Sequence, residues 1–118
     1  MKHGDVLRVQ FPNRGGREQA GTRPAILMQS DDGPKVCPTL VVVPLTSQLA
    51  AARFAHTVRV QPTPGTGLSV ESVALVFQIT AIDRANVVEQ LGAVAEEALD
   101  RVLAAIIAMI SPVAESSD

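Results

Sequence analysis

The sequence predicts a single, mainly β domain that ends in one α-helix, folded as a small and strongly bent antiparallel barrel. Three observations predict this class. The chain has 118 residues, of which 47% are hydrophobic, so its length and composition suit one packed domain. Short segments typical of strands follow one another between turns, and one helical pattern comes last. We expect the helix to cover an open side or end of the barrel.

The first strand is expected at residues 5–11, where apolar and polar side chains alternate. A polar, glycine-rich loop follows at residues 12–21. Pro24 favours an extended conformation for Arg23. A short apolar strand is then expected at residues 25–28.

Further strands are expected in the middle of the chain. Residues 39–45 are nearly all apolar and rich in β-branched side chains, which predicts a strand buried on both faces. Pro44 within it implies an edge, a bulge or the end of the strand. Residues 56–61 alternate and predict another strand, with His56 on the sheet surface. The run at 69–82 predicts one long strand or a tight hairpin, which makes five or so strands in all. One helical turn is expected within residues 47–54.

The last third of the chain predicts the helix. Apolar residues recur there at three- and four-residue steps and form one face: Leu91, Ala95, Ala98, Leu99, Val102, Ile106 and Met109. Gly92 disfavours an early start, so we expect the helix to begin near Val94. It should end at Ser111. The expected domain is therefore 1–112, with 113–118 as a frayed tail.

Composition excludes several classes of site. Aromatic residues make up 3% of the chain, with no Trp and no Tyr, which argues against an RNA-binding sheet studded with stacking rings. Cys37 is the single cysteine, so an internal disulfide and a cysteine-based zinc cage are excluded. With only His3 and His56, a dedicated transition-metal site is not expected. The prediction is a protein without metal or cofactor.

The net charge of −2 is unevenly distributed. Residues 1–61 hold eight basic and four acidic side chains, whereas residues 62–118 hold two basic and eight acidic ones. This pattern predicts a basic face and an acidic face on one domain, or simply two solvated faces. The N-terminus is polar, and the most apolar window, 102–110, is too short to span a bilayer. We expect a soluble, cytoplasmic protein without membrane contact.

Two sequence blocks stand out, while the common phosphate-loop, dinucleotide, zinc-protease and serine-hydrolase motifs are absent. EQAGTRP at residues 18–24 is a basic glycine loop that leads into a strand, and VVVPLTS at residues 41–47 is a buried strand that ends in hydroxyls. Arg23 offers planar donors that match two phosphate oxygens, and Thr46 and Ser47 offer hydroxyl donors. A phosphate clamp is one explanation. The other explanation is structural: the arginine makes a hydrogen bond within the fold, and the hydroxyls cap a turn.

These blocks resemble the MazF/PemK family of toxin endoribonucleases from bacterial toxin–antitoxin systems. The resemblance covers about residues 3–110, and the matching segments follow the family order. Each segment alone is weak, but the two blocks together are fairly specific. The matches are Gly4-Asp5-Val6, residues 18–24, residues 41–47, Gly67-Leu68 before Ser72-Val73, and Gln78-Ile79 before Ile82-Asp83.

The resemblance implies an SH3-like β-barrel with a C-terminal helix, a homodimer, and a cognate antitoxin that occludes the RNA groove. It implies metal-independent cleavage of single-stranded RNA, mRNA included, at short sequences. Arg23 and Thr46 would be the catalytic pair. The other residues implied at the substrate are Glu18 and Gln19, in the loop beside the channel, and Ser47 and Gln78, next to the site.

The implied chemistry is an attack by the RNA's own 2′-OH on the adjacent phosphate. It leaves a 2′,3′-cyclic phosphate or its 3′-phosphate, and a 5′-OH. Arg23 would stabilise charge on the phosphoryl oxygens, and Thr46 would bind the phosphate or orient the 2′-OH. Arginine is an awkward general base, so the base is not assigned. Arg14 and Arg17 either steer the polyanion or are simply exposed, and we favour steering.

The sequence departs from the family at one place. Some members carry a catalytic arginine and aspartate on the strand that ends in the position of Gln78, where this chain has Leu75 and Phe77. Neither side chain can transfer a proton, so the implied catalysis would depend on Arg23 and Thr46. A phenylalanine there can stack on a base, but on so apolar a strand we expect it in the core. The departure keeps two alternatives open: a toxin of the same fold that binds DNA gyrase, and an inactive homologue that binds its antitoxin.

Overall fold

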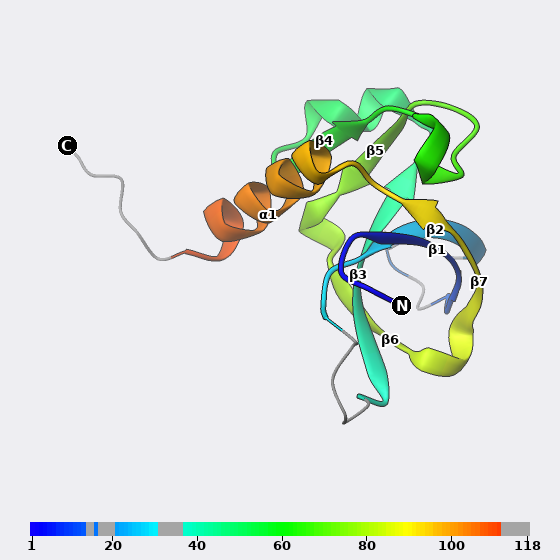
Figure 1. Ribbon diagram of the computed structural model, residues 1–118. Helices are drawn as coiled ribbons and strands as arrows, with labels where there is room; N and C mark the ends of the chain where they lie inside the picture. The colour runs from blue at the N-terminus through cyan, green and yellow to red at the C-terminus, as the bar shows by residue number, and fades with distance from the viewer. Residues whose placement is uncertain (14–15, 17–20, 31–36, 112–118) are drawn as a thin grey trace.

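Seven strands, four short 3₁₀ turns and one α-helix form the regular structure of the residues that the computed structural model describes, namely 1–13, 16, 21–30 and 37–111 (Figure 1). The mainly β fold with a C-terminal helix is therefore confirmed. The predicted tail, 113–118, lies outside the described residues. The elements are β1 (Asp5–Phe11), β2 (Gly21–Leu27), β3 (Thr39–Thr46), β4 (Thr57–Val60), β5 (Ser72–Leu75), β6 (Thr80–Asp83), β7 (Val87–Ala93) and α1 (Glu96–Ile110).

The sheet branches at β3. Its strands follow the order β4-β5-β3-β2-β1-β7, and β6 also pairs with β3. All the pairings of these seven strands are antiparallel. In Figure 1 the sheet curls into a barrel-like shape, and α1 lies against β4. The pairings of the described strands run from β4 to β7 without closing, so the barrel is open.

Pro44 lies where β3 exchanges one neighbour for another. The pairing with β6 ends at Val42, and the pairing with β5 begins at Leu45. On its other side Pro44 still pairs with Ala25 of β2. Because proline has no N–H to donate, the gap between two partners is a place where a strand tolerates it. The end of β3, with Thr46, therefore lies at the junction of both parts of the sheet.

The prediction of one strand or a tight hairpin over residues 69–82 is wrong. β5 and β6 lie along the same edge of β3 and both run antiparallel to it, separated by the 3₁₀ turn Val76–Gln78. The chain thus continues in one direction and steps outward opposite Val43 and Pro44, the stretch of β3 that has no partner on this edge. The missing N–H of the proline explains why the ladder breaks there.

Two smaller predictions about the middle of the chain have opposite outcomes. The helical turn expected within residues 47–54 is confirmed as a 3₁₀ turn, Leu49–Arg53. The placement of His56 in a strand is wrong, because β4 begins at Thr57 and His56 precedes it with a φ of 60°. A positive φ is uncommon for residues other than glycine and marks a turn here.

The start of the last third of the chain also differs from the prediction. β7 was not expected, and Leu91, assigned to the helix face, lies in this strand, which pairs with β1. The helix begins at Glu96, close to the expected start near Val94. Ala98 and Val102 of the predicted apolar face are buried against the sheet.

The central strands β1, β2 and β3 contribute to two apolar clusters, one on each face of the sheet. In β1, Val6 belongs to the cluster closed by β4, β5 and α1, whereas Leu7 and Val9 belong to the cluster closed by β6. Successive side chains of a strand point to opposite faces, so a strand between two clusters is apolar throughout. This confirms the burial on both faces that was predicted for residues 39–45.

Gly67 lies at a close approach of two backbones. It follows the turn Pro64–Thr66, which packs against β7, and it has a φ of 73°. A Cβ at this position would overlap the backbone carbonyl of Leu91. Both the positive φ and the contact therefore require glycine.

We expect Gly67→Ala to lower the free energy of unfolding by about 3 kcal/mol, a fall in Tm of about 10 °C or more. Gly21→Ala is the matched control. Gly21 also has a positive φ, 81°, but a Cβ there would meet no atom within 4 Å, so its loss should be about 1 kcal/mol. Thermal unfolding followed by circular dichroism measures both variants. Equal losses would contradict a steric role for the approach to β7.

Candidate active site

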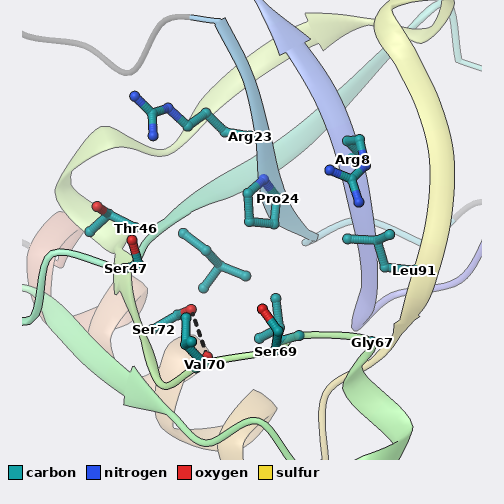
Figure 2. A pocket seen from close by; sticks show the side chains of 12 residues that line it. Arg8, Arg23, Pro24, Thr46, Ser47, Gly67, Ser69, Val70, Ser72 and Leu91 are labelled. Atoms are coloured by element: carbon teal, nitrogen blue, oxygen red, sulfur yellow. Dashed lines mark hydrogen bonds between the residues drawn. The ribbon is translucent and has the colours of Figure 1, made fainter.

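A groove of about 210 Å³ opens where β1, β2 and the end of β3 face the segment between the 3₁₀ turn Pro64–Thr66 and β5 (Figure 2). Leu91 of β7 adds to one side of it. Strands contribute Arg8, Arg23, Pro24, Leu45, Thr46, Ser72 and Leu91, and connecting segments contribute Ser47, Gly67, Leu68, Ser69 and Val70. The groove thus combines the two sequence blocks with residues from elsewhere in the chain.

The pairing of β2 with β3 brings the two predicted catalytic residues together. Ala25 is opposite Pro44, and the same register continued by two residues places Arg23 opposite Thr46. Both residues line the groove. In Figure 2 the Arg23 guanidinium lies on the same side of Pro24 as the Thr46 and Ser47 hydroxyls. A guanidinium and two hydroxyls on one wall are suited to an anion with several oxygens, such as a phosphate.

Thr46 is held in place by burial and by its own backbone. It is only 6% exposed, and its Oγ1 accepts a hydrogen bond from the Gln48 N–H at 3.2 Å. A hydroxyl that accepts one bond can still donate its hydrogen. The side chain can therefore donate to an oxygen in the groove without breaking the bond that orients it.

Arg8 is a groove residue that sequence reasoning missed. It lies opposite Pro24 in the pairing of β1 with β2, and Figure 2 places it on the other side of Pro24 from Arg23. Its Nε donates to Glu89 Oε2 at 2.8 Å, and both side chains remain partly exposed. In the sequence Arg8 is an ordinary polar position of an alternating strand. The signal that could have found it is the hairpin pairing, which aligns β1 with the block at residues 18–24.

The groove carries positive charge. Of the described residues that line it, Arg8 and Arg23 are basic and none is acidic. Arginine side chains in a partly enclosed space favour an anionic ligand over a neutral one, although Glu89 offsets part of the charge of Arg8. No three His, Cys, Asp or Glu side chains gather at one place in the part of the chain that the structure describes. None of the helices in that part is long and apolar enough to cross a membrane.

A second cavity, of about 350 Å³, lies beside the groove and shares Thr46 with it. It is lined by Thr46, Gln48, Ala51, Phe54, Leu75, Phe77 and Gln78. Gln78, predicted next to the site, is thus close to Thr46 but outside the main groove. The expectation that Phe77 is in the core is wrong, because its side chain is 39% exposed. The 3₁₀ turn interrupts the alternation of the strand, burying Val76 and turning Phe77 outward.

The structure thus brings together three of the predicted site residues, Arg23, Thr46 and Ser47, with Gln78 in the adjoining cavity. Leu75 lies at the wall of that cavity and is nearly buried. The remaining predicted substrate-binding residues, Arg14, Arg17, Glu18 and Gln19, lie outside the described residues.

The chain is similar to known proteins over almost its whole length. The sequence profile of the family described as "PemK-like, MazF-like toxin of type II toxin-antitoxin system" matches residues 2–110. The endoribonuclease EndoA of Bacillus subtilis is 30% identical over 102 residues, which are 86% of this chain and 87% of that protein.

Solved structures show the same fold. The crystal structure of MazF (form I) from Deinococcus radiodurans superposes with a TM-score of 0.78 at 23% identity, covering 93% of this chain and 96% of that one. An endoribonuclease in complex with its cognate antitoxin from mycobacterial species superposes with a TM-score of 0.72 at 15% identity, covering 98% and 99%. The match of the family profile to residues 2–110 and the similarity to the Bacillus relative show the family: this chain is a member of the PemK-like, MazF-like toxin family of type II toxin–antitoxin systems.

Proposed function

We propose that residues 1–112 form one endoribonuclease domain that cleaves single-stranded RNA, mRNA included, at short sequences and without a metal ion. The observation that carries the proposal is the meeting of Arg23 and Thr46 in one positively charged groove. The relative from Bacillus subtilis is an endoribonuclease by name, which supports RNA as the polyanion.

In the proposed step the 2′-oxygen of one nucleotide bonds to the adjacent phosphorus, and the bond from phosphorus to the 5′-oxygen of the next nucleotide breaks. The 2′-OH loses a proton and the leaving 5′-oxygen gains one, which gives a 2′,3′-cyclic phosphate and a 5′-OH. The ribose already holds the nucleophile beside the phosphorus, so the step needs no metal-bound water. The cyclic phosphate can then be hydrolysed to a 3′-phosphate.

Arg23 and Thr46 have different tasks in this step. The phosphoryl oxygens gain negative charge as the new bond forms, and the Arg23 guanidinium stabilises them through paired N–H donors. The Thr46 hydroxyl donates to a phosphate oxygen or orients the 2′-OH, with the Gln48 N–H fixing its direction. Ser47 and Gln78 bind the substrate beside this pair. We extend the proposal to Arg14, Arg17, Glu18 and Gln19, which would contact or steer the RNA strand.

We also propose that the chain acts as a homodimer and is neutralised by a cognate antitoxin that covers the groove. The antitoxin proposal is supported by the mycobacterial endoribonuclease, which has the same fold and was solved with its cognate antitoxin. The dimer proposal is supported by large apolar side chains that remain exposed near the end of α1, among them Ile107 and Ile110. Exposed apolar side chains that lie together are typical of interaction surfaces.

The test is cleavage of a long RNA of mixed sequence in the presence of EDTA, with the new 5′ ends mapped. We expect cuts at one shared short sequence, with 5′-OH ends, for the wild type and for the control Arg101→Ala on α1. Arg23→Ala should make none of these cuts. Folded, antitoxin-free wild type that leaves the RNA intact would contradict the nuclease and favour a toxin that binds a protein such as gyrase, or an inactive homologue.

Arg8 should contribute to binding rather than to the chemical step. We expect Arg8→Gln to weaken binding of an uncleavable, 2′-deoxy-blocked RNA and to lower the slope of log K against log salt concentration by about 0.7, because one phosphate contact is lost. Glu89→Gln is the matched control, since it removes the partner of Arg8 but keeps the cation. Titrations at several salt concentrations measure both. An unchanged slope for Arg8→Gln would contradict the contact.

A further inference from the structure

The cavity beside the groove holds the aromatic side chains that the core does not use. The chain has three Phe and no Trp or Tyr. Phe11 is buried, whereas Phe54 and Phe77 both line this cavity and are 47% and 39% exposed. Leaving two large rings in contact with water is unfavourable unless a ligand covers them. Their position next to Thr46 points to the substrate of the groove.

The two rings form an ordered pair. Their centroids are 5.7 Å apart at an interplanar angle of 63°, an edge-to-face arrangement. The guanidinium carbon of Arg53 lies 4.4 Å from the centroid of the Phe54 ring, and Arg53 also donates to the Ala50 carbonyl at 3.0 Å. Two rings packed edge to face thus line the cavity, and the Arg53 cation lies over the ring of Phe54. Such surfaces bind nucleobases, because every base has a π-face and an adjoining phosphate.

Backbone hydrogen bonds fix the main chain at both phenylalanines. The Phe54 N–H donates to the Ala51 carbonyl at 3.1 Å, at the end of the turn Leu49–Arg53. The Phe77 N–H donates to the carbonyl of His56 at 3.3 Å, which links the turn Val76–Gln78 to the chain before β4. Side chains placed by turns that are bonded at both ends are pre-organised, which lowers the cost of binding.

We propose that Phe77 and Phe54 form a stacking subsite for the one nucleobase that adjoins the cleaved phosphate, and that this subsite sets part of the sequence specificity. The inference rests on the proposed nuclease function. Three features favour a base over another occupant. The cavity shares Thr46 with the phosphate groove, so a base seated in it would adjoin the phosphate. Its volume of about 350 Å³ is that of a small-ligand site.

The third feature is the polar part of the lining. Gln48 and Gln78 bring two amides to the cavity, each with a donor and an acceptor that suit the edge of a base. Stacking is tolerant of base identity, whereas amide contacts to an edge are not. The rings are therefore expected to supply affinity at this position and the amides to supply the choice of base.

The experiment is a double-mutant cycle between the protein and the RNA. The substrate is a short RNA that carries the sequence mapped with the wild type, and each position next to the cut is replaced in turn by an abasic ribonucleotide. We expect the wild type to lose about 10-fold in kcat/KM at one of these positions. On the intact RNA, Phe77→Leu should have a kcat/KM about 10-fold below that of the wild type. On the RNA that lacks this base, the variant and the wild type should have the same kcat/KM.

The controls separate stacking from folding. Phe77→Tyr keeps the ring and should behave as the wild type, whereas Phe54→Leu should resemble Phe77→Leu. Val88→Ala removes an exposed apolar side chain of β7 and should change neither rate. If the loss from the Phe77 variant and the loss from the missing base multiply at every position, the two effects are independent. That result would overturn the inference and assign the rings to an antitoxin or a second copy. Wild type that cleaves no RNA would instead overturn the proposed function, before any variant is compared.

Discussion

Arg23→Ala should lower the rate of RNA cleavage by about 10³-fold or more, with little change in stability. Removing a single preorganised donor from a charge-stabilising site costs about 10²–10³-fold, and an arginine supplies two parallel donors to one phosphate. Arg23 is exposed at the wall of the groove, so its loss removes little buried surface and should leave the fold intact.

The shape of the cation matters as well as its charge. Arg23→Lys keeps the charge but loses the planar fork, so we expect it to remain about 10²-fold below the wild type. Single-turnover cleavage of an RNA with one cut site measures the chemical step, and thermal unfolding of each variant checks the fold. Cleavage by Arg23→Ala within about 10-fold of the wild type would show that the guanidinium is not part of the reaction.

Thr46→Val should lower the cleavage rate by about 10²-fold. Valine has nearly the shape of threonine, so the variant removes the hydroxyl while a side chain of similar size stays at this nearly buried position. The Gln48 N–H also loses its acceptor, at a cost of about 1 kcal/mol in stability. Single-turnover rates and unfolding curves together separate the catalytic loss from the structural one.

Two neighbouring variants make the Thr46 prediction specific. Thr46→Ser retains the hydroxyl and should stay within a few-fold of the wild type, whereas Ser47→Ala, at an exposed position, should lose less than about 10-fold. If Thr46→Val cleaves as fast as the wild type and Thr46→Ser does not, the methyl group and not the hydroxyl is what matters. That result would remove Thr46 from the chemistry.

The main groove was largely predictable because two sequence blocks carry it. Strand patterns placed Arg23 at the start of one strand and Thr46 at the end of another. The pairing of β2 with β3 then brings them together, since its register, continued past Ala25 and Pro44, places them opposite each other. Arg8 was not predictable in the same way, because its position depends on the pairing of β1 with β2 and no local pattern distinguishes it from a solvated side chain.

The aromatic pair was missed for a tertiary reason. Between Leu75 and Thr80 no Gly or Pro marks a break, so the local sequence predicts a continuous strand. The break is caused by Pro44 on the facing strand, which leaves a stretch of β3 without a partner on that edge. Phe77 turns outward as a result. Pro44 itself predicts an irregularity in its own strand, but no local signal marks the segment opposite.

β7 was missed because its pattern fits two periods. Apolar residues at 87, 88 and 91 match both a helix and a half-exposed strand, and the true helix follows after only two residues. Gly92 was the discriminating signal. From the sequence it is read as a residue that disfavours a helix. In the structure glycine is needed because a Cβ at this position would collide with the turn Pro64–Thr66, which packs against the strand.

The most direct test of the account is a comparison of two RNAs in EDTA with the wild-type protein. One is an RNA with a single mapped cut site, and the other differs only by a 2′-deoxy sugar at the nucleotide before the cut. If Arg23 and Thr46 promote attack by the 2′-OH, the first RNA is cut to a 5′-OH end and the second stays intact, although both bind. Cleavage of the deoxy RNA at a similar rate would contradict the account, because the nucleophile would then be something other than the 2′-OH.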